Sequence, residues 1–487
     1  MPRFHPVFFP AFRAFLGLCA GLSIATSPVH AALPVPKGSG GAQDGGAPLS
    51  QMSQMSQNPN AGEPAQAMAK GEARVPARSR PEAGANTQRA CSMSEAVCVH
   101  AALSPEAGIS ETGMAWTLHA AERTLRGMRD LGLAAPLPDG ISGGTPALDI
   151  YLETKGSEPP WAHAEMESCG YFFDRCPAFV LLPPPSRTGP EACVHEQHIS
   201  YAIAHAALLG LDAGAGAGSL AMAAGYIASL LAPCAPLELD AVNRFQLHPE
   251  RTLLPSEKSE LDGSFLFPSY LDQRFGAGGF GQIISALIAV SVQRTEPLSM
   301  HWQNEPDVFD ALRNAMRDRG QSLDELMLDF SVARAFVGSR SDEDHLRDSA
   351  RFGDAGRVRF EWTLPYDSLP RRLAPLRPIA AMGATYLWLD LSSAKAGAEL
   401  TFVADWELDV LFRWALVKVD PKGREAGRID VAGIYGSRHA ERTVRELSGL
   451  AGLLIVGTNT GSVDAGQPFD PDDTPAPLRS YTVTLYQ

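Results

Sequence analysis

The hydrophobic pattern of this 487-residue chain changes near residue 356 from helical spacing to short strand-like runs. This change constrains the fold more than any single motif in the sequence does. Residues 89–355 carry apolar side chains at helical spacing, as in the segment MAWTLHAAERTLRGMRDLGL at 114–133. Residues 356–487 instead hold eight short strand-like runs, several of them separated by turn signals such as DPKG. The sequence therefore predicts an α+β chain, in which a mainly helical domain over 89–355 precedes an all-β sandwich domain over 356–487.

Local signals place further elements inside the helical part. Two short apolar runs, at 147–153 and 178–183, predict strands. Ser322 and Glu325 have the spacing of a capping box at the start of a helix. Helices are expected at 190–211, 219–232, 265–275, 280–293, 306–320 and 322–336.

The N-terminus has the features of a signal peptide over residues 1–31. Arg3 and Arg13 precede the apolar run AFLGLCAGLSIA, and the small-residue motif VHA follows, which predicts cleavage after Ala31. Cys19 follows a leucine that is too large for a typical lipobox. No later apolar run is long enough to predict a transmembrane segment. We therefore expect an exported protein, in the periplasm or outside the cell.

Residues 32–88 differ from the rest of the chain in composition. They are rich in Gly, Ser, Pro, Ala and Gln, with the small repeat SQMSQMSQ at 50–57, and they hold almost no aromatic or β-branched residues. Such a segment cannot bury enough apolar surface to offset the entropy of ordering it. We interpret it as a disordered linker.

The charge and the cysteines agree with export. A formal net charge of −14 disfavours nucleic acid as a partner, because an acidic protein repels phosphate backbones. Removal of Cys19 leaves an even number of cysteines, which is typical of disulfides in an oxidising compartment. Six cysteines allow 15 pairings, and the sequence does not choose among them. The candidates are Cys91, Cys98, Cys169, Cys176, Cys193 and Cys234.

The segment AIAHAALLGLD at 202–212 lies inside a predicted helix. Zincin-type peptidases carry two zinc-binding histidines one helical turn apart, with a glutamate between them that activates water. Here His205 stands at the first position, but Ala206 and Leu209 stand where the glutamate and the second histidine would be. The next helix, which begins SLAMAAGY, has no acidic residue for a third ligand.

In the order of its parts, the region 113–338 resembles a secreted zincin-type metallopeptidase of the gluzincin or hyicolysin-like kind. The helix WTLHAAERTLRGMRDLGL precedes a glycine-rich turn and strand, DGISGGTPALDIYL, and then the helices IAHAALLGLDAG and SLAMAAGYIASLLA. FLFPSYLDQRFGAGGFGQII and LDELMLDFSVARAFVG complete the order. The resemblance implies a zincin-like domain, and the sandwich is similar to accessory domains that often follow secreted peptidases.

The broken motif implies a loss of catalysis. A single histidine cannot hold a catalytic zinc ion, and alanine cannot activate water. We therefore expect a non-catalytic metallopeptidase homologue that acts as a binding or structural module, without a cofactor and with an unidentified protein or surface as partner. An unrelated helical domain is an alternative, which a structure lacking a sheet beside the 190–211 helix would favour.

A second alternative keeps the chemistry but moves the metal. Glu191, His195, His198 and His205 would project from one side of the predicted helix, because an α-helix turns 100° per residue. Such a face could hold zinc in a metal-dependent hydrolase, a peptidase with a relocated site. A polar stripe on the helix surface is the simpler interpretation, because one helix rarely supplies every ligand of a metal.

Two glycine-rich segments match the residue patterns of known functional motifs, but the secondary structure predicted around them differs from what those motifs require. GISGG at 140–144 matches the nucleophile elbow of serine hydrolases, with Ser142 as nucleophile, but a strand follows it where a helix should be. GAGGFG at 276–281 matches a dinucleotide fingerprint, but a predicted helix precedes it where a strand should be. We interpret both motifs as turns.

Overall fold

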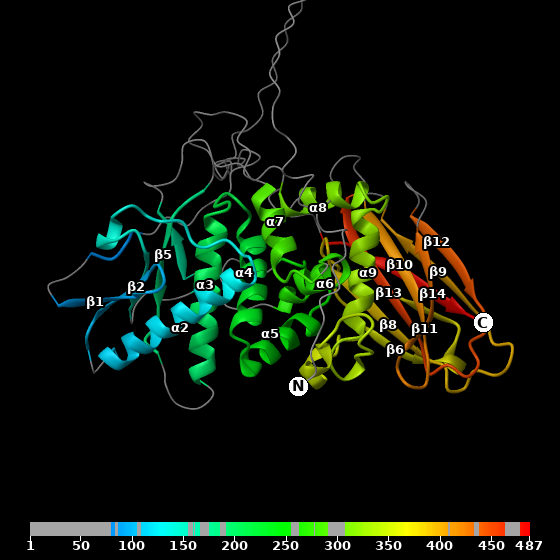
Figure 1. Ribbon diagram of the computed structural model, residues 1–487. Helices are drawn as coiled ribbons and strands as arrows, with labels where there is room; N and C mark the ends of the chain where they lie inside the picture. The colour runs from blue at the N-terminus through cyan, green and yellow to red at the C-terminus, as the bar shows by residue number, and fades with distance from the viewer. Residues whose placement is uncertain are drawn as a thin grey trace, which may run out of the picture. The chain divides into compact units, whose positions relative to one another are not determined.

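The chain has helices and one sheet in its N-terminal part and two sheets in its C-terminal part, so it is α+β as predicted (Figure 1). The predicted signal peptide and most of the predicted linker lie outside the described residues. The described residues belong to one compact unit of the chain. The computed structural model describes residues 79–82, 86–104, 109–153, 159, 161–165, 175–185, 191–254, 263–276, 278–290, 307–407, 410–432, 438–462 and 478–487.

The first sheet has five strands in the order β1-β2-β3-β5-β4. Strands β2, β3 and β5 run parallel, and β1 and β4 pair with them in antiparallel fashion at the two edges. Every residue of β3 and β5 is buried, which explains the near-continuous apolar runs from which both strands were predicted. The strands are β1 (Thr87–Cys91), β2 (Val97–Ala102), β3 (Leu148–Leu152), β4 (Ala162–Ala164) and β5 (Ala178–Leu182).

Two long helices lie next to this sheet. Helix α2 (Glu111–Asp130) begins after Ser110, whose side chain accepts a hydrogen bond from the backbone N–H of Gly113. Helix α2 contacts β2, and α3 (Glu191–Leu209) contacts β4 and β5 (Figure 1). A sheet therefore lies beside α3, so the feature that would have favoured an unrelated helical domain is missing.

The two helices after α3 are separated by prolines. Helix α4 (Ala217–Leu231) packs on α3 through small buried side chains such as Ala206 and Ala223, which allow the two helices to approach closely. Pro233 follows the C-cap of α4, and a second proline lies in the first turn of α5 (Ala235–Leu247). The sequence predicted α4 but did not indicate α5.

Four further helices connect this part to the sandwich. The last of them begins with the predicted capping box, because the backbone N–H groups of Ser322 and Glu325 bond each other's side chains at 3.0 and 3.3 Å. None of the described helices is both long and apolar enough to cross a membrane. The four helices are α6 (Leu266–Phe275), α7 (Gln282–Val290), α8 (Val308–Arg317) and α9 (Leu323–Ala335).

The C-terminal part is a β-sandwich of two sheets. One sheet has the order β11-β10-β13-β8-β6 and the other β12-β9-β14-β7. Apolar side chains of both sheets, including Phe402 and Trp414, form one core cluster. The strands are β6 (Trp362–Pro365), β7 (Arg371–Leu373), β8 (Ala384–Asp390), β9 (Leu400–Trp406), β10 (Val410–Val419), β11 (Glu425–Ala432), β12 (His439–Val444), β13 (Gly452–Ser462) and β14 (Tyr481–Tyr486).

Helix α9 covers the outer face of the five-stranded sheet of the sandwich (Figure 1). Val332 of α9 and Phe336, the residue that caps its C-terminus, pack with Val417 and Tyr386 of the sheet in one apolar cluster. The Tyr386 hydroxyl donates a hydrogen bond of 2.8 Å to the Ser331 carbonyl. Strand β10 is therefore buried on both faces, and the helical part is joined to the sandwich by a continuous apolar contact.

Candidate functional site

The four residues of the predicted metal face all lie on α3. His195 and His205 are buried, and His198 is half-buried. The side chain of Glu191 lies outside the described residues.

His195 and His198 each contact a different tryptophan. The His195 ring stacks on Trp116 of α2 with 5.2 Å between centroids, and burial lowers its pKa to about 3, helped by the nearby His198. The His198 ring lies 4.4 Å from the Trp161 ring, and burial lowers its pKa to about 4. Both imidazoles are therefore neutral over the ordinary pH range.

His205, the position that matches the first zinc ligand, lies in the core. Burial, with a smaller effect of His163 on β4, lowers its pKa to about 4. Ala206 is fully buried and Leu209 is 4% exposed, and both belong to the main apolar cluster. At the two positions where the resemblance to zincin-type peptidases would place a base and a second ligand, this chain therefore has buried apolar side chains.

These contacts bear on the metal prediction. Across the described ranges, no group of three or more His, Cys, Asp or Glu side chains is arranged to hold a metal ion. The face that includes Glu191 is not covered by this observation and stays a prediction. On the described part of that face, the histidines have aromatic neighbours.

The candidate cysteines form disulfides between neighbours in sequence. Cys91 bonds Cys98, and Cys193 on α3 bonds Cys234 at the start of α5. Cys176 is also disulfide-bonded, and Cys169 lies outside the described residues. The bond between Cys193 and Cys234 ties α3 to the segment that follows α4.

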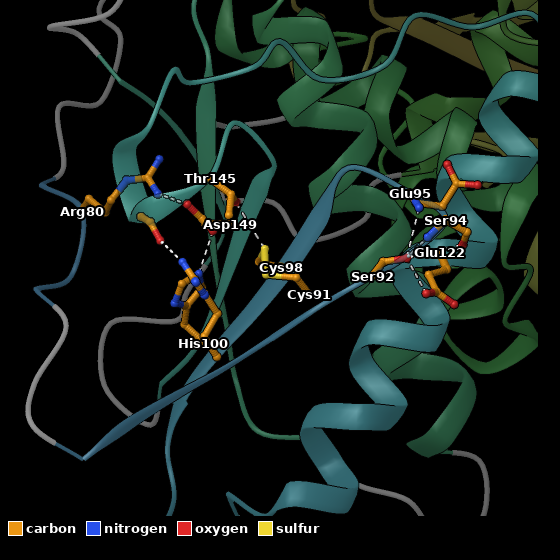
Figure 2. Close-up of a disulfide and its surroundings, with 12 residues drawn as sticks. Arg80, Cys91, Ser92, Ser94, Glu95, Cys98, His100, Glu122, Thr145 and Asp149 are labelled. Carbon is orange, nitrogen blue, oxygen red and sulfur yellow. Dashed lines mark hydrogen bonds and ion pairs between the residues drawn. A yellow bond between two sulfur atoms is a disulfide. The ribbon is translucent and has the colours of Figure 1, made fainter.

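A second polar centre, which the sequence did not indicate, lies on the first sheet around a guanidinium group. Arg80 Nε donates to Glu165 at 2.5 Å, and its other nitrogens donate to Asp139 and Asp149 and, at 3.3 Å, to the Tyr151 hydroxyl. Figure 2 shows the guanidinium pointing toward Asp149. We call this group the Arg80 cluster; it consists of Arg80, His100, Asp139, Asp149, Tyr151 and Glu165.

The sheet positions the other members of the cluster. His100 on β2 stands next to Tyr151 on the parallel strand β3, and their rings stack with 4.7 Å between centroids. His100 Nε2 lies 2.6 Å from Asp149 Oδ1 (Figure 2). The GISGG turn lies against this strand, and a Cβ atom on Gly143 would collide with the Asp149 carboxylate. The turn is therefore packed against the cluster, and it does not follow a strand as a nucleophile elbow would.

Burial sets the electrostatics of the Arg80 cluster. The pKa values of Asp139 and Glu165 are raised by burial, although the Arg80 guanidinium opposes the shift. Burial disfavours the charged guanidinium too, but its hydrogen bonds to Tyr151 and Glu165 outweigh that effect and raise the pKa of Arg80. This arrangement is suited to holding a planar cation in a largely buried place.

A cavity of about 560 Å³ lies elsewhere in the helical part, between α4, α6 and the segment 343–352. Its volume is in the range of small-molecule sites. Buried apolar side chains, among them Tyr226, Phe265 and Leu266, line one part of it. Exposed charged residues line its edge: Glu343, Arg347, Asp348 and Arg351.

Comparisons with known proteins identify no family for this chain. No protein-family model matches this chain, and no curated protein matches it. Among solved structures, the pre-peptidase C-terminal domain of a collagenase from Bacillus anthracis matches 26% of this chain and 98% of its own, at 9% identity and a TM-score of 0.18. The Yersinia pseudotuberculosis-derived mitogen matches 24% of this chain and 86% of its own, at 14% identity and a TM-score of 0.16.

The Arg80 cluster was not predicted, because the sequence around Arg80 does not indicate its partners. Arg80 lies in the range predicted as linker, where composition gave no sign of a partner. Asp149 offered a weak signal, because it is a charged residue inside the apolar strand run ALDIYLE and its side chain had to find a buried partner. His100 and Glu165 lie in segments that the sequence did not assign to strands.

Proposed function

We propose that this protein is an exported, non-catalytic relative of zincin-type metallopeptidases, which acts as a binding or structural module. The observation that carries the proposal is the packing of Ala206 and Leu209. Both side chains are buried in the apolar core, at the positions where such a peptidase has its base and its second histidine. A metal-bound water needs an open coordination position and a base beside it, and this part of α3 offers neither.

Two further observations support parts of this proposal. A sheet lies beside α3, which agrees with the order of parts in the resemblance and disfavours an unrelated helical domain. The disulfides Cys91–Cys98 and Cys193–Cys234 are typical of an oxidising compartment, which supports export.

A binding role is favoured over a purely structural role by the cavity beside α4. A space of about 560 Å³, lined by both apolar and charged residues, has the volume of a small-molecule site. The partner in this proposal is a protein or surface component that remains to be identified. The alternative, a hydrolase with a relocated metal site, needs the ring nitrogens of His195 and His198, whose rings contact different tryptophans, to converge on one ion.

The first test is metal content. The protein would be purified from Ala32 onward without a histidine tag, and zinc per chain would be determined by mass spectrometry. We expect far less than one zinc ion per chain and no cleavage of a casein substrate, before or after incubation with zinc.

A double variant, His195→Gln with His198→Gln, is the matched control. One zinc ion per wild-type chain that survives dialysis and is lost in the double variant would overturn the proposal in favour of the relocated site. Peptidase activity that is removed by a chelator would do the same.

A further inference from the structure

The Arg80 cluster brings three carboxylates from three separate segments to one guanidinium. Asp139 precedes the GISGG turn, Asp149 lies on β3, and Glu165 follows β4. Their side chains are 1%, 0% and 10% exposed. The rings of Tyr151 and Phe179 stand 5.9 and 5.5 Å from the Arg80 carbon between the nitrogens. The surroundings of Arg80 are thus an acidic pocket with aromatic walls.

The pocket needs a cation. Three buried carboxylates without a positive partner would be strongly unfavourable, because removal of one member of a buried ion pair leaves an uncompensated charge. Arg80 supplies that charge and uses all three of its nitrogens. A planar group with five N–H donors suits this spread of acceptors better than a lysine ammonium does.

The pocket also has a hydrogen-bond acceptor without a partner in the described part of the chain. Asp139 Oδ1 is buried and has no hydrogen-bond partner among the described residues. A buried carboxylate oxygen in this state is costly, so the Asp139 carboxylate, which Arg80 binds through its other oxygen, can still accept a hydrogen bond from a bound donor.

Arg80 reaches the pocket from a segment without regular structure. Residues 79–82 belong to no helix or strand, and they come just after a range with almost no aromatic or β-branched residues. The Arg80 side chain is 15% exposed, so the pocket is not fully closed around it. A segment without a backbone ladder can withdraw from its site at a smaller cost than a strand can.

We propose that this pocket is a guanidinium-binding site, which the chain fills with its own Arg80 and which takes an arginine side chain of a partner when the 79–82 segment withdraws. The pocket is defined by Asp139, Asp149, Tyr151, Glu165 and Phe179. It lies on the sheet and uses none of the α3 histidines, so this inference stands whether or not the protein binds zinc.

Chemical rescue of Arg80→Ala tests the site. The variant would be made in the chain that begins at Ala32, and its thermal unfolding followed with and without millimolar methylguanidinium. We expect a lower Tm than in wild type and a recovery of that Tm by methylguanidinium but not by methylammonium at equal concentration. Wild type should respond to neither compound, because Arg80 occupies the pocket.

Arg89→Ala is the matched control for rescue. Arg89 is exposed and donates to the Gly143 carbonyl at 3.0 Å close to the same turn. We expect no recovery of that variant by methylguanidinium. If Arg80→Ala does not fold unaided, the yield of refolding with each compound is compared instead, with Arg80→Gln as a second variant. Equal effects of the two cations, or no effect of either, would overturn the proposal.

A pair of peptides then separates a free guanidinium compound from an arginine side chain as the ligand. Calorimetry would compare a short arginine-containing peptide with the same peptide carrying citrulline, a neutral isostere of arginine. We expect the arginine peptide to bind Arg80→Ala about tenfold more tightly or better. Rescue by methylguanidinium, with equal binding of the two peptides, would reject the partner side chain as the ligand.

Discussion

The imidazole Nε2 of His345 lies 2.9 Å from the carboxylate of Glu425, although 80 residues separate them in sequence. The Nδ1 atom of the same ring lies 2.8 Å from Asp342, and the ring stacks on Phe336, at the C-terminal cap of α9, with 4.1 Å between centroids. Glu425 is the first residue of β11. His345 therefore links the helical part to the sandwich through two carboxylates and an aromatic face.

The link makes stability depend on pH. Burial disfavours the charged imidazole, but hydrogen bonds to Asp342 and Glu425 outweigh it and raise the pKa of His345 to about 9. Above about pH 6.5, the ordinary histidine value, the folded state holds a proton that the unfolded state has lost. The contribution of the link, about 3 kcal/mol, is therefore fully present below that pH and is lost as pH rises through about 9.

Denaturant unfolding of His345→Gln across this pH range checks the prediction. Wild type should lose more stability than the variant as pH rises, because only wild type releases the proton. His439→Gln is the control, since His439 is 51% exposed and its pair with Asp405 is at the surface. Parallel curves for wild type and His345→Gln would contradict the assignment.

The buried histidines of α3 predict the opposite behaviour in acid. Because burial lowers the pKa of His205 to about 4, the unfolded state takes up a proton first as pH falls below about 6.5. Stability due to this group is therefore lost as pH falls from about 6.5 toward about 4, by about 1.4 kcal/mol for each pH unit. His205→Leu should flatten the acid limb of the stability curve and become more stable than wild type near its lower end.

The control for this prediction is His119→Leu on α2. His119 is 69% exposed, so its loss should leave the acid limb unchanged. An acid limb of equal slope in wild type and His205→Leu, measured by urea unfolding at a series of pH values, would show that His205 is not kept neutral by burial.

The two described disulfides should differ in their effect on stability. Cys193 and Cys234 are 41 residues apart in sequence, and Cys91 and Cys98 are 7 apart. The longer loop loses more entropy when it is closed in the unfolded chain. Double replacement by alanine should cost about 4 kcal/mol for the first pair and about 2.5 kcal/mol for the second. Denaturant midpoints with unchanged slopes would measure both, and the reverse order of losses would contradict the loop argument.

The close contact between strand β13 and an indole ring of β10 in the sandwich core predicts that one position of β13 must be glycine. Gly457 on β13 stands opposite Trp414 on β10, and a Cβ atom there would lie 2.5 Å from the indole ring. Trp414 is fully buried and cannot move away without disturbing the core. Gly457→Ala should therefore destabilise the protein by about 1–3 kcal/mol.

Gly427→Ala is the matched control in the same sheet. The nearest atom to a Cβ at that position is the end of the flexible Lys418 side chain, at 4.0 Å. We expect no loss of stability there, and a small gain from the reduced freedom of the unfolded chain. Equal effects of the two substitutions on the unfolding midpoint would reject the contact with Trp414 as the cause.

Elements with a strong local pattern were predicted well from the sequence. Helix α9 was expected at 322–336 from its capping box and runs over Leu323–Ala335. Strand β10 was expected from the run VLFRWALVKV and spans those residues. In both cases the period of the side chains and the signals at the ends lie within one short segment, so no distant partner is needed to recognise them.

Short edge elements were not predicted, because their partners define them. Strand β7 has three residues and pairs with β14, more than a hundred residues later in the chain. Strand β4 also has three residues, and it pairs with β5 at the edge of the first sheet. Strand β1 begins at Thr87, inside the range predicted as linker, and its ladder with β2 gives it order that its composition does not suggest. A run of three residues has too few periods to show a pattern.

The sequence by itself determined the fold class, the main helices and strands, and that Ala206 and Leu209 do not complete a His-Glu-x-x-His motif with His205, because each of these depends on residue types at short, fixed spacings. Tertiary structure alone decided which polar side chains lie next to one another. It placed His195 and His198 against different tryptophans and gathered Arg80, Asp139, Asp149 and Glu165 into one pocket. The charges of that pocket come from four separate segments, and only the pairing and packing of the first sheet bring them within hydrogen-bonding distance.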